Sequence, residues 1–524
     1  MPAGRRRNKK RNTKWTSKAP RPHKAPRQRL EEVNRLKDRI TGYILDGNDV
    51  RAEQQLQFLR ENSQDRPDLL AKSLCNLANR VPGQAWKLRL YEEAQGLNPH
   101  DTITLNSYAT ALAERGEHDR AFELFQRSLA LDEDNTITLN SYATALAERG
   151  EHGRAFELFQ RSLALEEDTI TLTSYATALA EAGEHGRAFQ LFQRSLALKE
   201  DTITLTSYAT ALAQMGEHGR AFQLFQRSLD IEENNTVTLT SYATALAEAG
   251  EHDRAFEWFQ RSLDLKGNDT ITLNSYATAL AERGEHGRAF ELFQRSLALD
   301  EDNTVTLNSY ATALAEMGEN GRAFELFQRS LDLKEDTITL NSYATALAQM
   351  GEHGRAFQLF QRALAIKEDT ITLNSYATAL AQMGEHDRAF QLFQRSLAVK
   401  PDGGATLLQL GLFLETQGRY EEAIEHLARV PPLETDKRRA GFVCFNLGRL
   451  YFRIGEKGKA AEWFERAAEH SDHATASKLN AARHILAEHP HSQEAVAILE
   501  DIVRVMPGHG PARRMLRLNL GLKE

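Results

Sequence analysis

Residues 102–135 read TITLNSYATALAERGEHDRAFELFQRSLALDEDN, and this 34-residue stretch decides the fold because it recurs along the chain. Its tyrosine occurs nine times, at intervals of 33 or 34 residues, as Tyr108, Tyr142, Tyr175, Tyr208, Tyr242, Tyr276, Tyr310, Tyr343 and Tyr376. In the 33-residue units the missing residue falls in the acidic turn, where a deletion rotates no helix face. A repeat of this period indicates an array of supersecondary units that stack on one another.

Each unit is predicted to form two antiparallel helices. The first carries one apolar stripe, spaced i, i+3, i+4 and i+7, made of Leu105, Tyr108, Ala109 and Leu112. The apolar face of the second consists of Ala121, Phe122, Leu124, Phe125, Ser128 and Leu129. Asp101 or Thr102 is expected to cap the first helix, and Gly116 to end it in the left-handed conformation. Because two short helices cannot bury these faces alone, neighbouring units must stack, which predicts an all-α solenoid.

This pattern resembles the tetratricopeptide repeat, a 34-residue helix–turn–helix. The positions that match its small or apolar sites are Leu105, Leu112, Gly116, Ala121, Phe125 and Leu131. Tyr108 and Ala109 depart from it, since the family usually has Leu-Gly there, and Ser128 replaces the usual alanine. The resemblance implies that the array winds into a right-handed superhelix.

Reading outward from the regular units predicts the organisation of the whole chain. We expect a disordered basic tail over 1–30, an N-terminal helical cap over 31–66, a diverged unit over 67–101, nine regular units over 102–402, diverged units over 403–508 and a C-terminal solvating helix over 509–524. Terminal units that differ from the middle are what a capped solenoid requires.

Composition restricts the class of protein. The chain of 524 residues is 41% hydrophobic and 26% charged, and no apolar run approaches the ~18–20 residues of a membrane span. No apolar stretch follows the basic N-terminus, so we expect no secretory signal peptide. The two cysteines, Cys75 and Cys444, exclude a disulfide framework and favour a reducing compartment. We therefore predict a cytoplasmic protein, or a nuclear one if the source is eukaryotic, because RRRNKKR at 5–11 would serve as a nuclear localisation signal.

Near-identical units argue against an enzyme, because catalysis needs several different groups converging on one point. The sequence has no Gly-rich phosphate loop, HExxH motif or nucleophile elbow. Eight of the nine turns contain a histidine, the first being His118. Helices packed ~8–10 Å apart place such histidines too far from one another to share a zinc ion. We expect each to pack against its own helix pair, with a collective pH response as the alternative, and we predict no catalytic residue, cofactor or metal.

The candidate binding site is the concave groove that first helices line in the family. The resemblance places positions two, five, nine, twelve and thirteen there, which are Ile103, Asn106, Thr110, Ala113 and Glu114 in the first regular unit. The fifth position is asparagine or threonine and the ninth is threonine. Because they are four residues apart, their side chains share one helix face, and repeated along the array they can form a neutral hydrogen-bonding ladder for an extended peptide. The remaining members of this ladder are Asn140, Thr144, Thr173, Thr177, Thr206, Thr210, Thr240, Thr244, Asn274, Thr278, Asn308, Thr312, Asn341, Thr345, Asn374 and Thr378. The alternative is that repetition simply multiplied a solvated polar face.

The basic tail is a second candidate site. Residues 1–30 hold twelve Lys or Arg and no acid, whereas the rest of the chain carries 53 basic against 73 acidic groups. Such a segment can bind RNA or DNA phosphates without reading bases, and the residues we select are Arg5, Arg6, Arg7, Lys9, Lys10, Arg11 and Lys14. It can also lie on the acidic solenoid of its own chain, bridge to another chain in a salt-dependent way, or stay solvated.

Three functions follow from these features. The first is a non-enzymatic scaffold that binds protein or peptide segments in the groove. The second is an adaptor anchored to nucleic acid by the basic tail. The third is a self-assembling structural protein, which the diverged ends of the array disfavour.

Overall fold

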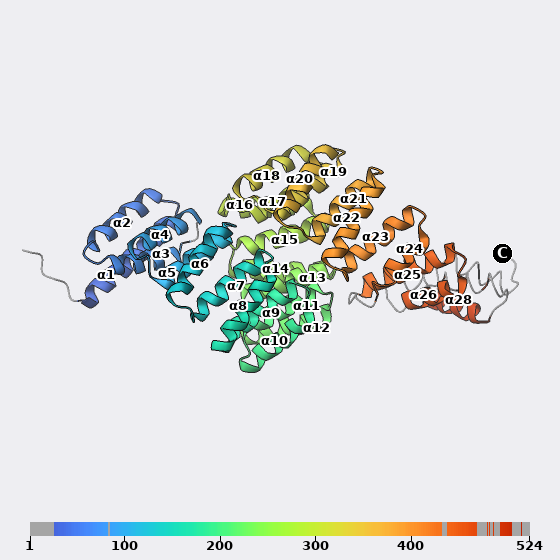
Figure 1. Ribbon diagram of the computed structural model, residues 1–524, viewed down its shortest axis with the longest axis horizontal. Coiled ribbons are helices and arrows are strands. Elements are labelled where there is room, and N and C mark those ends of the chain that lie inside the picture. The colour runs from blue at the N-terminus through green and yellow to red at the C-terminus, as the bar shows by residue number, and fades with distance from the viewer. Residues whose placement is uncertain are drawn as a thin grey trace, which may run out of the picture. The chain divides into compact units, whose positions relative to one another are not determined.

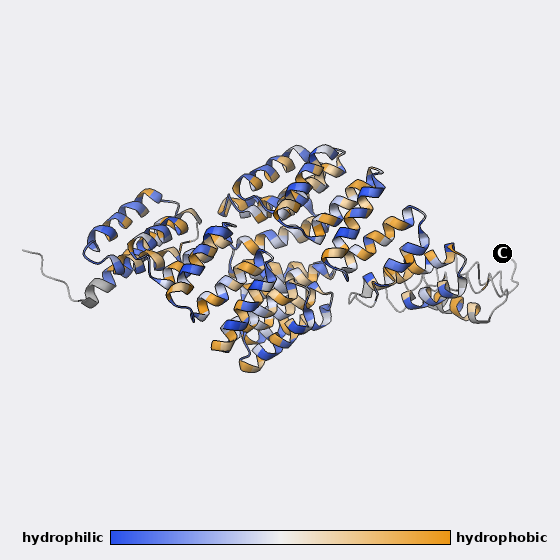
Figure 2. Ribbon diagram, in the orientation of Figure 1, coloured by the Kyte–Doolittle hydropathy of each residue, from blue (hydrophilic) through white to orange (hydrophobic). Residues whose placement is uncertain are grey.

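A computed structural model describes residues 26–81, 84–431, 437–468 and 493–505, together with Leu479, Ala482, Leu486 and Met515. The regular elements in these ranges are all α-helices, and they follow one another along the chain in pairs (Figure 1). Apolar and polar residues alternate around the helices, as amphipathic packing requires (Figure 2). Described residues up to Ala145 form one compact unit and described residues from Leu146 onward form another. The all-α repeat architecture predicted from the sequence is confirmed.

The nine regular units correspond to nine helix pairs. Their first helices are α5 (Thr102–Glu114), α7 (Thr136–Glu148), α9 (Thr169–Glu181), α11 (Thr202–Gln214), α13 (Thr236–Glu248), α15 (Thr270–Glu282), α17 (Thr304–Glu316), α19 (Thr337–Gln349) and α21 (Thr370–Gln382). Their second helices are α6 (His118–Leu131), α8 (His152–Leu165), α10 (His185–Leu198), α12 (His218–Ile231), α14 (His252–Leu265), α16 (His286–Leu299), α18 (Asn320–Leu333), α20 (His353–Ile366) and α22 (His386–Val399).

Further helices flank the array on both sides. Before it lie α1 (Pro26–Leu45), α2 (Asp49–Asn62), α3 (Pro67–Ala78) and α4 (Gln84–Leu97). After it lie α23 (Gly404–Thr416), α24 (Tyr420–Leu427), α25 (Lys437–Arg453), α26 (Lys457–Ala468) and α28 (Gln493–Val505). Of the predicted C-terminal helix over 509–524, only Met515 is among the described residues, and it packs against a cluster that includes Leu499 and Ile502.

The start of α1 corrects the predicted extent of the basic tail. The tail was expected to be disordered through residue 30, but α1 begins at Pro26. Proline is favoured as the first residue of a helix, because its fixed φ suits the helix and its missing N–H would have no partner there. Residues 1–25, and with them the seven candidate nucleic-acid contacts from Arg5 to Lys14, lie outside the described residues.

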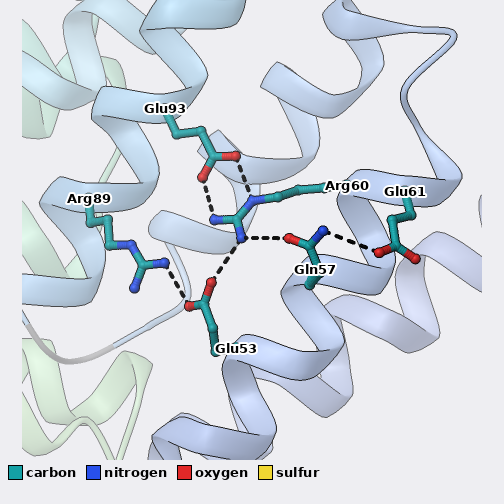
Figure 3. Close-up of polar contacts among 6 residues, drawn as sticks. All are labelled: Glu53, Gln57, Arg60, Glu61, Arg89 and Glu93. Atoms are coloured by element: carbon teal, nitrogen blue, oxygen red, sulfur yellow. Dashed lines mark hydrogen bonds and ion pairs between the residues drawn. The ribbon is translucent and has the colours of Figure 1, made fainter.

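The N-terminal helices are joined by a network of ion pairs between α2 and α4 (Figure 3). The Arg60 guanidinium lies 2.7 Å from Glu93 and 2.9 Å from Glu53, and Arg89 lies 2.7 Å from Glu53. Hydrogen bonding to Glu93 is the largest effect that raises the pKa of Arg60 above its ordinary value. These contacts link α2 of the N-terminal cap to α4 of the first diverged unit.

Inter-unit stacking is aromatic. The second helix of each of the first eight regular units contributes a fully buried phenylalanine, which stacks on the tyrosine of the following unit at a ring-centroid separation of 5.0–5.3 Å. Phe293 on Tyr310 is one such pair. The tyrosine that marks the repeat in the sequence therefore connects each unit to the one before it.

The predicted ends of the first helices are confirmed. Asp101 caps α5, because its side chain accepts a hydrogen bond from the Thr104 backbone N–H at 3.1 Å. Asp or Asn caps the first helix of the other regular units in the same way. The glycine after each of these helices has a φ between +77° and +86°, with Gly116 at +84°. Glycine alone adopts this conformation without steric cost.

Capping by aspartate predicts a local pH dependence. Replacing Asp269 by alanine should lower the free energy of opening of α15 by about 1 kcal/mol, since the Thr272 N–H loses its acceptor. Burial raises the pKa of Asp269, but hydrogen bonds from Lys266 and Thr272 outweigh it, so the net pKa is lowered. The carboxylate's contribution is therefore present above the ordinary Asp pKa of about 3.9 and is lost as the pH falls through the folded-state value.

Asp269→Asn is the matched variant, because Asn235 and Asn303 cap equivalent helices. It should keep most of the stability at neutral pH and lose the acid-dependent part. Hydrogen exchange of the α15 amides at neutral pH, with acid titration of the helix signal, measures both effects. Equal acid sensitivity in Asp269→Asn and the parent would contradict the assignment.

Candidate functional site

The first helices lie on the inner side of the array. From α9 to α23, each odd-numbered helix contacts the next odd-numbered one, whereas no comparable contact joins consecutive even-numbered helices over the described part of the chain. When the helices on one side of a stack pack closely and those on the other side lie farther apart, the stack curves. The closely packed side is then the concave face. The groove implied by the family resemblance is therefore formed by the first helices.

The curvature brings distant units together within the array. A Cβ placed on Gly150 would lie 2.9 Å from Cε and 3.1 Å from Nζ of Lys367, and one on Gly183 would lie 3.1 Å from Nζ of Lys400. Both pairs are 217 residues apart, which is between six and seven units. The loop after a second helix thus meets the turn inside a unit one superhelical turn earlier, and the first helices face the inside of that turn.

The second position of every unit is an exposed aliphatic side chain. Isoleucine or valine there is 64–70% exposed in all nine units, and these residues, which we call the aliphatic ladder, are Ile103, Ile137, Ile170, Ile203, Val237, Ile271, Val305, Ile338 and Ile371. Sequence reasoning placed Ile103 on the groove but selected only polar residues and Glu114 for binding. The signal it missed is a β-branched residue kept at a solvent-facing position in each unit. An exposed aliphatic side chain that recurs at the same position in every unit is a candidate contact for a ligand that spans several units.

The fifth position is less open to the groove than predicted. Thr173, Thr206, Thr240 and Asn374 are buried. The Thr173 hydroxyl lies 3.2 Å from that of Ser195 in its own unit and 2.9 Å from that of Thr204 in the next. Thr206 and Thr240 form equivalent clusters, and Asn374 donates to Thr406 at 2.9 Å. At these four positions the side chain connects neighbouring units.

The other asparagines of the fifth position remain partly exposed. They are Asn106, Asn140, Asn274, Asn308 and Asn341. Each has a buried Oδ1 with no hydrogen-bond partner among the residues that the structure describes. A bound donor could satisfy these oxygens, so their role in binding stays a prediction.

The ninth position also differs from the predicted ladder. Six of its threonines donate to the carbonyl oxygen four residues earlier at 2.8–3.0 Å, as Thr110 does to Asn106, and the others that do so are Thr144, Thr177, Thr244, Thr312 and Thr345. Thr210 and Thr278 are half-buried and Thr378 is exposed. A threonine whose proton is used within its own helix offers the groove a methyl group and an acceptor, so a ligand must supply the donors.

The thirteenth position adds negative charge to the same face. Glu114 is exposed, with its carboxylate 3.9 Å from Lys87 Nζ. Glu248, Glu282 and Glu316 occupy this position in three consecutive units, and none forms an ion pair with another described residue. All three side chains are exposed. Partial burial is the largest effect that raises the pKa of Glu248 and of Glu282; the charge of Glu282 raises the pKa of Glu248 further, whereas His252 opposes the rise at Glu282.

The repeated histidines are the first residues of the second helices. In seven units the imidazole lies 6.0–6.4 Å from the phenylalanine four residues later, as His218 does from Phe222. Burial lowers the pKa of His152 and of His185, and Lys367 and Lys400 lower them further. Among the described residues, no group of three or more His, Cys, Asp or Glu side chains is arranged to hold a metal ion.

Family models and solved structures that resemble this chain were found. Tetratricopeptide-repeat family models match residues 88–136, 337–371, 380–441 and 443–469. The crystal structure of yeast Tom70 is similar, with 14% identity and a TM-score of 0.48, covering 83% of this chain and 99% of that one. The APC/C hetero-tetramer Cut9–Hcn1 has 13% identity and a TM-score of 0.36, covering 88% and 98%. No helix in the described ranges is long and apolar enough to span a membrane. The helix pairs and the family matches together identify the chain as a member of the tetratricopeptide-repeat family.

Proposed function

We propose that this protein is a non-enzymatic scaffold that binds extended protein or peptide segments along the concave face of its first helices. Tetratricopeptide-repeat solenoids are typically interaction scaffolds, which supports the general role. The aliphatic ladder carries the more specific proposal, because the same apolar side chain stays 64–70% exposed through nine units. A cytoplasmic location remains part of the proposal.

The ladder favours a partner that crosses several units. Each unit contributes only one Ile or Val to the aliphatic ladder, so a ligand must contact several units at once to bind tightly. Full burial of such a side chain contributes about 1.5–3 kcal/mol, and about two-thirds of each is available. Three such side chains together therefore supply about 3–6 kcal/mol, which is at least a hundredfold in affinity. The alternative of a nucleic-acid adaptor depends on residues Arg5 to Lys14, which lie outside the described ranges.

Replacing three residues of the aliphatic ladder tests the proposal. Peptides selected on the parent protein from a random-sequence display library should bind the triple variant Val237→Ser, Ile271→Ser and Val305→Ser at least about tenfold more weakly, since three apolar contacts are lost. Fluorescence anisotropy of labelled peptides measures the affinities.

The matched control changes exposed leucines at the ends of the second helices in the same three units. Leu265, Leu299 and Leu333 are 46%, 44% and 38% exposed, and the variant replaces all three by serine. It should bind the peptides as the parent does. If both triple variants bind equally well, the ladder is not the binding surface and the proposed function loses its support.

A further inference from the structure

We infer that the cavity between α20, α21 and α22 binds an aliphatic carboxylate, a ligand with an apolar chain and one anionic end. This site goes beyond the proposed function, because its walls are the second helices α20 and α22 and it is separate from the aliphatic ladder. Its volume of about 410 Å³ falls in the range of about 300–1,000 Å³ that is usual for small-ligand pockets. Three properties of the cavity carry the inference: its unpaired donors, its charge and its apolar wall.

The repeated tyrosine has a hydrogen-bond partner for its hydroxyl in eight of the nine regular units. The donor is an arginine on the second helix of the same unit, a glutamine on the second helix of the preceding unit, or both. Tyr310 shows the complete arrangement, since its hydroxyl accepts from Gln294 at 3.2 Å and from Arg322 at 3.1 Å. In that unit the three polar groups satisfy one another.

The ninth regular unit leaves the same three groups unpaired. Gln361, Tyr376 and Arg388 occupy the equivalent positions, and all three line the cavity. Tyr376 is only 4% exposed, and its contacts are with the rings of Phe357 and Phe360. None of the three polar side chains hydrogen-bonds to another described residue. An O–H, an amide and a guanidinium are therefore available together to donate to the oxygens of one carboxylate.

The charge of the cavity favours an anion. Its charged lining residues, within the described chain, are Arg388 and Arg395, which lie two turns apart on one face of α22. Gln391 lies between them, at a position where five of the other regular units have glutamate. Arg395 pairs with Glu368 through Nε, and Arg388 lies 3.8 Å from Glu385, so both guanidinium groups keep N–H groups for a ligand. An acidic ligand thus meets two cations without a carboxylate in the wall.

The rest of the wall is largely apolar. It includes Leu364 and Ala365 of α20, Leu380 of α21 and Leu392 of α22. Leu380 is buried, whereas Leu364 and Leu392 are half-buried and can be covered further. Leu392 shares its helix face with both arginines, because it is four residues after one and three before the other. An aliphatic chain can therefore contact the wall while its carboxylate reaches the donors, which a simple inorganic anion cannot do.

Titration of the full chain with matched acids and amides tests the site. N-acetyl-alanyl-leucyl-leucine and octanoate carry this chemistry from two sources, the end of a peptide and a free fatty acid. Ligand-observed NMR should find at least one acid bound at least about tenfold more tightly than its own terminal amide, because hydrogen bonds to a charged acceptor are stronger than those to a neutral one. The acid that binds more tightly identifies the source.

Matched variants locate the carboxylate. Arg388→Gln should weaken binding of that acid at least about tenfold, since a charge-assisted hydrogen bond is lost. Tyr376→Phe keeps the ring stacked on Phe360 and removes only the hydroxyl, so a loss of about threefold to tenfold is expected. Arg322→Gln is the control, because it removes the equivalent arginine from a unit in which the tyrosine is already satisfied. It should bind the acid within about twofold of the parent.

A charge insertion gives an independent check. Gln391→Glu places between the two arginines the glutamate that five other units have, and it should weaken binding by about threefold to fivefold by competing for them. Gln358→Glu makes the same change at the equivalent exposed position of α20, which is not among the lining residues, and should leave binding within about twofold.

Three outcomes would overturn the inference. They are equal affinity of each acid and its amide, no binding of either acid at about 10 mM, and equal loss in Arg388→Gln and Arg322→Gln. The triple variant Val237→Ser, Ile271→Ser and Val305→Ser should bind the acid as the parent does, because the aliphatic ladder lies on the first helices. Failure at the cavity would therefore leave the proposed function standing, and failure of the aliphatic ladder would leave the cavity site standing.

Discussion

Replacing Phe293 by alanine should lower the free energy of opening of α16 and α17 by about 3–5 kcal/mol. The Phe293 side chain is fully buried and stacks on Tyr310 of the next unit, with 5.2 Å between ring centroids and 18° between planes. The substitution removes both the apolar burial and the inter-unit stack, and the surrounding helices relax only partly into the cavity. Since a solenoid is stabilised by nearest-neighbour interfaces, the loss should concentrate on the two adjoining units.

Native-state hydrogen exchange is the suitable measurement, because a long repeat array need not unfold in one two-state step. Phe290→Ala is the matched control: Phe290 lies on the same helix and contacts the same tyrosine at 5.2 Å, but it is only half-buried. Its effect should be roughly half as large, since less apolar surface is lost. Equal effects of the two substitutions, or a loss spread evenly over all nine units, would show that Phe293 is not an inter-unit contact.

Replacing Gly411 by valine should destabilise the diverged pair α23–α24 by about 2–3 kcal/mol. A Cβ on Gly411 would fall within the contact distance of Leu427 Cγ and lie 2.7 Å from its Cδ2, and Leu427 is fully buried, so neither helix can yield without repacking. Leu410-Gly411 is the Leu-Gly pair usual in the family, in place of the Tyr-Ala of the regular units.

Gly287→Val is the control for this prediction. Gly287 lies in the first turn of α16, and a Cβ there would meet nothing within 4 Å. Valine at an exposed helix position differs from glycine by only a few tenths of a kcal/mol. Hydrogen exchange of α24 and of α16, respectively, measures the two effects. A similar small change at both glycines would contradict the close packing of α23 on α24.

Local features were largely predictable. The tyrosine period, the apolar stripes, the capping aspartate and the left-handed glycine each depend on residues within a few positions of one another, so sequence alone specified the helix pairs and their stacking. Pro26 was missed as a helix start although proline at a first helical position is a local signal. The aliphatic ladder was also available from the pattern, because Ile or Val recurs at position two.

The environment of the fifth position could not be predicted in the same way. Asn106 and Thr173 occupy equivalent positions on their helices, yet one is partly exposed and the other is buried against Ser195 and Thr204. This position lies at the edge between the buried face and the groove. Whether the next unit covers it depends on side-chain size and on the small rotation between units, neither of which a helical period encodes.

Sequence by itself determined that this chain is a solenoid of tetratricopeptide repeats whose first helices carry aliphatic, polar and acidic rows. Tertiary structure alone decided which of those rows remain open and which distant units meet, as Lys367 does with Gly150 and Lys400 with Gly183. The physical reason is that small rotations between neighbouring units add up along the array. Each helix pair forms from local contacts, but the path of the superhelix is the sum of many small rotations between units, and contacts 217 residues apart exist only once that sum is complete.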